Sequence, residues 1–314
     1  MASMHSACSQ CQSQNHEIQD CPFFKVTSKF ANSDNESKKN MSNYDIPIYD
    51  THCHIDYVFK RLKHHNLCFK DFKESYFFPS NFKGCIGSFS DVSVYNNCSA
   101  WLDLLCQDGI WGSFGLHPHQ AKYFTDHIHE TMLQCLKHPK AVAVGECGLD
   151  LSRCNPLSTY SDQKSVFIKQ LQIAKQTNKP IVVHSRDAED HVYQILCDED
   201  MREWPIHIHC FTGNCTHLHR FVNEFPNMFF GFTNLISYST AKVTHEVVKC
   251  VPLDRILLET DAPYFVPKKL KNKCRFSHPG YVLFVAEEIA QIKNKDIHII
   301  LDNCLRNVEK LFKI

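Results

Sequence analysis

Two histidines separated by one residue, His52 and His54, end a short apolar segment that predicts a β-strand over Ile46–Cys53. Side chains on an extended chain alternate between two faces, so both imidazoles point to the same side, about 6–7 Å apart along the backbone. Two imidazoles on one face can chelate a single divalent metal ion. A lone His-x-His also fits two packed or surface histidines, so the rest of the chain must decide between these interpretations.

Further potential metal ligands follow other short apolar segments. They are Glu146, His184, His209 and Asp261. A single histidine at the end of a strand is usually a structural residue. Four histidines and two carboxylates at five strand ends are harder to explain as packing, because burying them without a metal would leave several polar groups unpaired, each at a cost of about 1–3 kcal/mol.

The segments that would position these residues are predicted to alternate between strand and helix. The expected strands are Ile46–Cys53, Gly84–Phe89, Trp111–His117, Ala141–Gly145, Pro180–His184, Ile206–His209, Met228–Phe232 and Arg255–Glu259. Eight strands, each followed by a helical stretch or a long loop, predict an α/β fold of the (β/α)8 TIM-barrel type. Its last helices would be Pro279–Ile292 and Lys295–Phe312. The candidate ligands would then converge at the mouth formed by the C-terminal strand ends, where barrel active sites are built.

The composition sets the class of protein. The chain has 314 residues, 43% of them hydrophobic, and a formal net charge of zero. This is enough for one large core and a small appendage, and it excludes a global basic field for nucleic acid, so such affinity would come from local clusters or bound cations. The 17 cysteines follow no disulfide pattern, and no signal peptide is evident. We therefore expect reduced thiols in a nuclear or cytosolic protein with no membrane partner.

A cysteine-rich segment, residues 1–26, precedes the barrel (residues 46–314) and is joined to it by a polar, flexible linker over residues 27–45. The spacing Cys-x2-Cys-x4-His-x4-Cys supplies the tetrahedral ligand set of a structural zinc ion. These ligands would be Cys8, Cys11, His16 and Cys21. The segment resembles a zinc knuckle, a module that binds single-stranded nucleic acid. A protein contact, or a tail with incidental cysteines, is the alternative, since Ser9 replaces the usual aromatic.

The barrel segment resembles the TatD family of metal-dependent deoxyribonucleases, within the amidohydrolase superfamily, and particularly its larger eukaryotic members. The resemblance covers about residues 46–312 and rests on motifs at Asp50–His54, Gly115–Pro118, Gly145–Asp150, His184–Ala188, His209–Gly213 and Glu259–Tyr264. Cys147 and the stretch Ser277-His278-Pro279 depart from the family pattern but spare the ligand set.

This resemblance implies two divalent cations (Mg, Mn or Zn) in the barrel. His52, His54, Glu146 and Asp261 would hold one cation, and Glu146, His184 and His209 the other. Glu146 and Asp261 would be the catalytic residues, with Asp261 as general base for a metal-activated water. Many related barrels use a carboxylated lysine as the bridge, but residues 141–150 contain no lysine. This favours the nuclease branch over the small-molecule amidases.

The implied activity is hydrolysis of phosphodiester bonds in DNA and/or RNA at single-stranded regions or 3′ ends, as a 3′→5′ exonuclease that also cleaves at abasic sites. Candidate substrate contacts are His117, Arg186, Lys268 and Lys269. Arg186 could instead pair with Asp187 or Glu189, and the two lysines could belong to a solvated loop. Phe211 and Tyr264 are candidates for stacking on a base, although such aromatics are usually packing residues. A lactonase or cyclic amidase, or a non-catalytic nucleic-acid or protein adaptor, is the alternative, and no oligomeric state is indicated.

Overall fold

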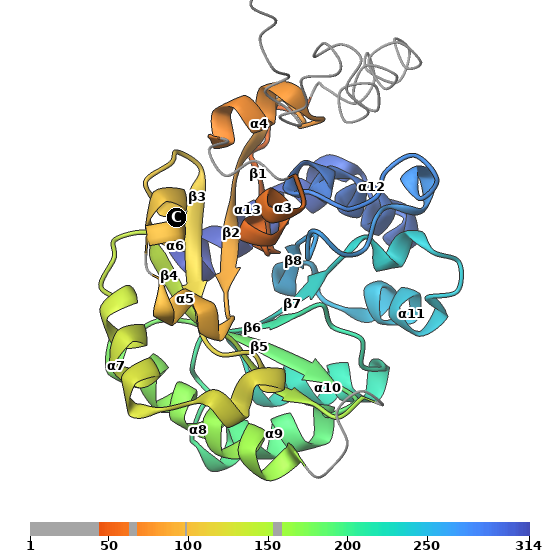
Figure 1. The fold of residues 1–314 in the computed structure, drawn as a ribbon. Coiled ribbons are helices and arrows are strands. Elements are labelled where there is room, and N and C mark those ends of the chain that lie inside the picture. The colour runs from red at the N-terminus through yellow and green to blue at the C-terminus, as the bar shows by residue number, and fades with distance from the viewer. Residues whose placement is uncertain (1–43, 63–67, 98, 153–158) are drawn as a thin grey trace, which may run out of the picture.

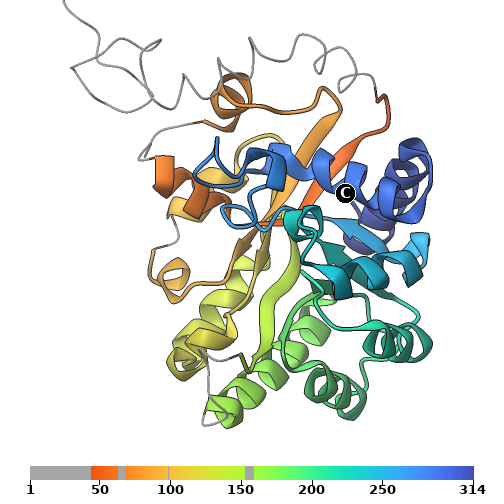
Figure 2. The same ribbon diagram turned by 90° about the vertical axis from the view of Figure 1, so that its right-hand side faces the viewer.

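The computed structural model describes residues 44–62, 68–97, 99–152 and 159–314. The predicted zinc-knuckle segment and most of the predicted linker lie outside these residues. Eight parallel strands form one sheet in the order β1 to β8, which confirms the expected TIM-type barrel. The helices lie outside the strands in two views related by a quarter turn (Figure 1 and Figure 2).

The strands occur where the sequence predicts them, with different ends. Their bounds are β1 Ile48–Cys53, β2 Phe82–Phe89, β3 Ile110–Phe114, β4 Ala141–Asp150, β5 Ile181–Arg186, β6 Ile206–His209, β7 Met228–Phe232 and β8 Ile256–Leu258. The largest differences are at the ends of β3 and β4. β3 stops three residues before His117, and β4 continues beyond Gly145 to Asp150.

The α-helices of the described residues follow the strands in sequence. They are α3 Ile55–Leu62, α4 Phe69–Ser75, α5 Val92–Asn96, α6 Ser99–Leu105, α7 Asp126–Cys135, α8 Tyr160–Thr177, α9 Glu189–Asp198, α10 Cys215–Glu224, α11 Lys242–Cys250, α12 Val282–Lys293 and α13 Ile297–Phe312. Short 3₁₀ turns include η2 Pro118–Tyr123, η4 Asn234–Ser237, η5 Leu253–Arg255, η6 Lys268–Leu270 and η7 Pro279–Tyr281. No helix in this part of the chain is both long and apolar enough to cross a membrane.

The first strand meets the segment after the last strand, which closes the barrel at its mouth. The backbone N–H of Asp261 donates to the carbonyl of His52 at 2.9 Å, and the N–H of His54 donates to the carbonyl of Ala262 at 2.7 Å. The buried Asp50 carboxylate accepts from both the N–H and the hydroxyl of Thr260. These bonds fix the backbone of His52 against that of Asp261, although the two residues are far apart in the sequence.

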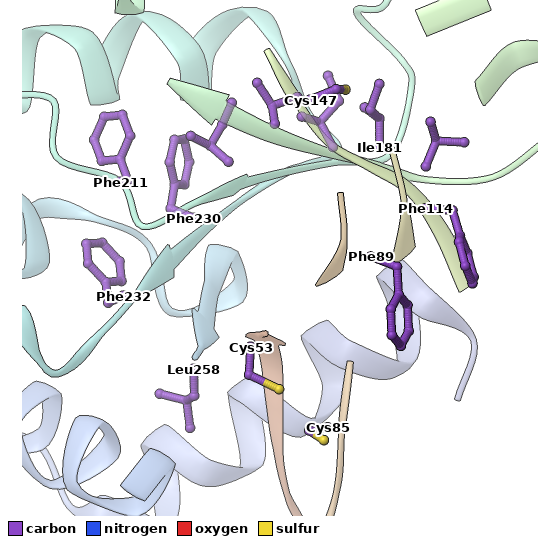
Figure 3. Packing of buried hydrophobic residues seen from close by; sticks show 14 of the residues in the cluster. Cys53, Cys85, Phe89, Phe114, Cys147, Ile181, Phe211, Phe230, Phe232 and Leu258 are labelled. Atoms are coloured by element: carbon purple, nitrogen blue, oxygen red, sulfur yellow. The ribbon is translucent and has the colours of Figure 1, made fainter. Parts of the chain in front are cut away.

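Two apolar layers hold this scaffold. The larger fills the space between the strands and the surrounding helices, where the rings of Phe211 and Phe230 lie 5.1 Å apart and those of Phe89 and Phe114 lie 5.2 Å apart (Figure 3). The smaller joins α13 to residues near the strand starts, namely Ile86, Val142, Ala143, Val182, Phe229 and Leu257 with Val308, Leu311 and Phe312. Apolar residues of α13 therefore pack against the N-terminal end of the barrel, opposite the mouth.

Candidate metal centre

The inward-facing residues of the strands change from apolar to polar toward the mouth. On β5, Val182 belongs to the apolar layer near α13, and His184 lies two residues further along. On β8, Leu257 belongs to the same layer, and Glu259 follows two residues later. Because side chains alternate with period two, this spacing sends both members of each pair into the barrel. Strand geometry thus places polar residues together at the mouth.

A β-bulge sets the direction of Glu146. In the pairing of β4 with β5, Gly145 lies opposite Val182 and Cys147 lies opposite Val183, so Glu146 is the extra residue without a partner. Gly145 has φ +124°, and a Cβ there would lie 2.3 Å from the carbonyl oxygen of Val182, so the position requires glycine. Bulges next to active sites commonly redirect a side chain. The predicted strand end at Gly145 therefore falls at the bulge, beyond which β4 continues to Asp150.

The two oxygens of Glu146 face different imidazoles. Oε2 lies 3.5 Å from Nε2 of His52 and 3.7 Å from Nε2 of His54. Oε1 lies 2.8 Å from Nε2 of His209 and 2.9 Å from Nδ1 of His184. One buried carboxylate therefore connects two sets of nitrogen ligands, which is the arrangement that a bridged pair of cations needs.

Asp261 completes the first group. Its Oδ1 lies 3.3 Å from Nε2 of His54 and 3.7 Å from Nε2 of His52. Asp261 Oδ1 and His52 Nε2 are buried and have no hydrogen-bond partner among the described residues. Buried polar atoms are normally paired, so these two atoms fit a cation between them. The described residues contain three sets in which the potential ligand atoms all lie within 4.8 Å of one another. These sets are His52, His54 and Asp261; His52, Glu146 and His209; and His117, Glu146 and His184.

The charges of the site are mutually balanced. Burial would raise the pKa of Glu146, but the imidazoles of His209, His117 and His184 hold this pKa well below its usual value. Burial would lower the pKa of His54, yet Asp261 and Glu146 raise it to about 9. The pKa of His184 is likewise about 9, because Asp150 and Glu146 outweigh the effect of burial. Without metal, protons on the imidazoles therefore supply the positive charge that the carboxylates attract.

Asp150 connects the site to a second histidine that the sequence does not single out. Its Oδ2 lies 3.2 Å from Nε2 of His184 and 2.8 Å from Nε2 of His119, and its Oδ1 accepts from the N–H of Ser152 at 3.0 Å. An imidazole that donates its Nε2–H to Asp150 presents a free Nδ1 lone pair, and in His184 this atom faces Glu146. The only sequence signals are that Asp150 ends the Gly145–Asp150 motif and that His119 lies two residues after His117.

Two buried glutamines of α8 fix the backbone around these residues. Gln163 accepts from the N–H of Asp150 at 2.8 Å and donates to its carbonyl at 3.1 Å. Gln170 accepts from the N–H of Leu116 at 2.7 Å and donates to its carbonyl at 3.1 Å. Each amide thus satisfies both polar groups of a residue at the mouth, and it replaces the strand pairing that is lost there.

A second polar pair lies beneath the metal ligands. His207 and Glu259 are both fully buried, with Nε2 of His207 2.8 Å from Oε2 of Glu259. The other oxygen of Glu259 accepts from the N–H of Cys210. Gly231 leaves room for the pair, because a Cβ there would lie 2.2 Å from Oε2. Burial raises the pKa of Glu259 to about 7. The signal in the sequence is again spacing, since His207 precedes His209 by two residues.

His117 lies at the N-cap of η2 rather than at the end of a strand. Its Nδ1 accepts from the N–H of His119 at 3.1 Å, and its Nε2 lies 3.5 Å from Oε1 of Glu146. An imidazole whose Nδ1 accepts a hydrogen bond carries its proton on Nε2 when neutral, and burial lowers the pKa of His117 well below its usual value. His117 therefore presents an N–H donor to the site, which suits a contact to an anionic oxygen.

The three remaining candidate substrate contacts differ in whether their charged groups already interact with other side chains. Arg186 is the exposed last residue of β5, and no described acidic side chain forms an ion pair with it. The ammonium of Lys269 lies 3.1 Å from Glu287 and 3.7 Å from the ring centroid of Phe284. Lys268 is exposed. Its backbone N–H donates to the hydroxyl of Ser237, and its carbonyl accepts from the N–H of Lys271.

Comparison with known proteins places these features in a family. The model of the family described as "TatD related DNase" matches residues 49–313. The human protein named "3'-5' RNA nuclease TATDN2" is 39% identical over 269 residues, which are 84% of this chain and 35% of that protein. The chain thus spans about a third of the length of this relative. The protein of Escherichia fergusonii named "3'-5' ssDNA/RNA exonuclease TatD" is 31% identical over 208 residues, 65% of this chain and 78% of that protein.

A solved structure agrees on the fold. The crystal structure of YJJV, a TatD homologue from Escherichia coli, superposes with a TM-score of 0.70 at 24% identity, covering 85% of this chain and 98% of that chain.

Proposed function

The chain belongs to the family of TatD-related DNases, and we propose that it is a metal-dependent nuclease that hydrolyses phosphodiester bonds of single-stranded nucleic acid from the 3′ end. The matched relatives bear names of 3′-5′ nucleases acting on RNA or on single-stranded DNA and RNA, which supports this polarity. The observation that carries the proposal is the placement of Glu146, whose two oxygens face different imidazoles.

In this proposal, His52, His54, Asp261 and Glu146 would hold one divalent cation, and His184, His209 and Glu146 would hold the other. The distances of 2.8–3.7 Å between these ligand atoms support a shared cation site around Glu146. Nitrogen-rich ligand sets favour Zn or Mn over Mg, which prefers oxygen ligands and water. When bound, two such cations supply a water of lowered pKa and neutralise charge on the phosphoryl oxygens.

The side chains of the site divide the remaining work of the reaction. Asp261 acts as general base, because its carboxylate lies beside the imidazoles of the site and can accept the proton of the attacking water. The water oxygen bonds to phosphorus as the bond to the 3′ oxygen breaks, giving a 5′-nucleotide and a shortened chain with a 3′ hydroxyl. His117 donates a hydrogen bond from its Nε2–H to a phosphoryl oxygen, and the departing 3′ oxygen takes up a proton from solvent. Arg186 and Lys268 contact phosphates further along the strand.

The test uses single-stranded DNA and RNA oligonucleotides labelled at the 5′ end, with Mn²⁺, Zn²⁺ or Mg²⁺ and with Glu146→Gln as the inactive control. We expect a ladder of 5′-labelled products that shorten from the 3′ end, and none with chelator. RNA is the first substrate to assay, because the human relative is named an RNA nuclease. A metal-loaded protein that cleaves neither nucleic acid, or that turns over only lactones or cyclic amides, would reject the proposal.

Two further predictions concern abasic-site cleavage and a structural zinc ion. A duplex with an internal abasic site tests the endonuclease activity, and cleavage at that site is expected. Zinc in the Cys8, Cys11, His16 and Cys21 segment concerns residues that the structure does not describe, so it stays a prediction. The measurement is one zinc per chain, beyond the barrel cations, that is lost in Cys8→Ser.

A further inference from the structure

The aromatic residues near the metal centre differ in whether a ring face is free. Phe211 is 2% exposed and packs on Phe221 and Phe230, so it is a core residue. The ring of Tyr57 stacks on that of His54 at 5.3 Å. Its hydroxyl donates to Asp91 at 3.2 Å. These contacts already occupy Phe211 and Tyr57.

Tyr264 is the exception, because 44% of it is exposed although it adjoins the ligands. Its ring centroid lies 5.9 Å from that of His54, with an interplanar angle of 81°. Its backbone N–H donates to the carbonyl of Asp261 at 2.9 Å, and the turn between them is held by a bond from the N–H of Ser277 to the carbonyl of Pro263 at 3.0 Å. Tyr264 and Asp261 thus belong to one hydrogen-bonded turn, so the backbone of Tyr264 is held beside the site.

A cation adjoins the exposed ring. The guanidinium of Arg61, on α3, lies over one face of the Tyr264 ring at 6.0 Å from its centroid, which leaves the other face for a base. Arg61 is exposed, and no described acidic side chain forms an ion pair with it. An aromatic platform combined with a cation is the chemistry that binds single strands, because every base has a π-face and every linkage carries a negative charge.

We propose that Tyr264 and Arg61 form a nucleobase-stacking subsite for the nucleotide adjoining the scissile phosphate. This inference rests on the proposed nuclease function and deepens it. The base stacks on the Tyr264 ring while the phosphate next to it is held at the ligands, since base and phosphate are carried by the same ribose. Stacking does not read hydrogen-bond patterns, so the subsite accepts any base and favours unpaired ends.

The decisive variant is Tyr264→Ala, assayed on single-stranded oligonucleotides in which the 3′-terminal or the penultimate residue is either normal or abasic. We expect kcat/KM for the first cleavage of the normal oligonucleotide to fall about 5- to 150-fold, as expected for loss of one stacked base. With the base missing at one of the two positions, kcat/KM of the wild type should fall by the same factor relative to the normal oligonucleotide. On that abasic oligonucleotide, kcat/KM of Tyr264→Ala should not fall further. Tyr264→Phe retains activity on the normal substrate.

The matched control is Tyr123→Ala. Tyr123 is 48% exposed, a similar fraction, but makes no ring contact with an imidazole of the described site. Its removal is expected to change kcat/KM by less than a factor of about two on every substrate. Thermal unfolding and metal content of Tyr264→Ala are measured in parallel to detect a folding defect. If Tyr264→Ala has such a defect, the same assays are done with Tyr264→Leu.

The role of Arg61 is tested by salt dependence. Arg61→Ala is expected to reduce the slope of log kcat/KM against log salt concentration by about 0.7, as expected for one lost phosphate contact on a single strand. Arg306→Ala serves as control, because Arg306 lies on α13 and is exposed. An unchanged slope in Arg61→Ala, or an equal change in both variants, would overturn this part of the subsite.

The outcomes separate the subsite from the nuclease assignment. A metal-loaded wild type that cleaves no oligonucleotide overturns the nuclease function and the subsite with it. A wild type that cleaves normal and abasic substrates, with a Tyr264→Ala variant that is unaffected or equally impaired on all of them, overturns the subsite alone. Equal impairment would mean that the ring only supports the turn carrying Asp261.

Discussion

Replacing Asp150 by asparagine keeps the shape of the side chain and removes its charge, so it tests how His184 is oriented. The carboxylate accepts from Nε2 of His184 at 3.2 Å, from Nε2 of His119 at 2.8 Å and from the N–H of Ser152 at 3.0 Å. An asparagine that still accepts from Ser152 presents its NH₂ group to the two imidazoles. Two donors cannot pair, so the proton of His184 must move from Nε2 to Nδ1, the atom that faces Glu146.

The expected loss follows from this tautomer change. A protonated Nδ1 cannot bind a cation, and partners of this kind typically contribute a factor of about 10–100 in metal affinity or activity. We therefore expect Asp150→Asn to weaken binding of one of the two cations about 10- to 100-fold. The affinity for the other cation, which we propose is held by His52, His54 and Asp261, should change little. At saturating metal, kcat should recover more fully than it does in Glu146→Gln.

The assay is competition for Mn²⁺ or Zn²⁺ with a chromophoric chelator, followed by turnover at rising metal concentration. His119→Ala is the control, because it leaves the bond between Asp150 and His184 intact and removes a side chain that is 45% exposed. It should keep metal affinity within about threefold of the wild type. Asp150→Asn that binds both cations and turns over normally would refute the reasoning.

Three further predictions use other contacts of the site. Metal loading at pH 7 should release protons, because the pKa values of His54 and His184 are about 9 and a cation must displace their protons. Metal affinity should therefore rise from pH 7 to 9. Calorimetry in two buffers of different ionisation enthalpy measures the released protons. Lys268→Ala should raise KM on long single strands more than Lys269→Ala does, since Glu287 and Phe284 already engage the Lys269 ammonium, and steady-state kinetics at low salt measures both. Glu146→Gln should lower kcat/KM about a thousandfold or more, which corresponds to ~4 kcal/mol of lost charge stabilisation, and should retain at most one barrel cation by elemental analysis.

Strand periodicity allowed much of the barrel and of the candidate site to be predicted. His52 and His54 follow an apolar run, and period two alone puts them on one face. His209 ends β6 in the same way. The strand order also follows from the alternation of strand and helix, because neighbouring parallel strands need a helical crossover.

Local irregularities account for the strand ends that were predicted wrongly. Glu146 lies in a bulge within β4, where an extra residue breaks the alternation that sequence reasoning assumes. His117 caps η2 through its own ring nitrogen, so its position depends on a turn and not on a strand. Sequence periodicity carries no information about either feature.

Contacts between distant segments account for most of what the sequence did not indicate. Asp150 meets His119 and His184 only after β4, β5 and η2 are assembled. The buried pair of His207 and Glu259 joins β6 to the residue after β8, and a single sequence does not state which strands lie close in the interior. The difference in exposure between Phe211 and Tyr264 likewise depends on packing, not on residue type.

The central claim is that Glu146 bridges two cations, and the most direct measurement is anomalous diffraction from crystals of the Mn²⁺-loaded protein. If Glu146 bridges two cations, two anomalous peaks are expected, one between Glu146 and the group of His52, His54 and Asp261, and one between Glu146 and the pair of His184 and His209. A single peak, or peaks that do not contact Glu146, would contradict it.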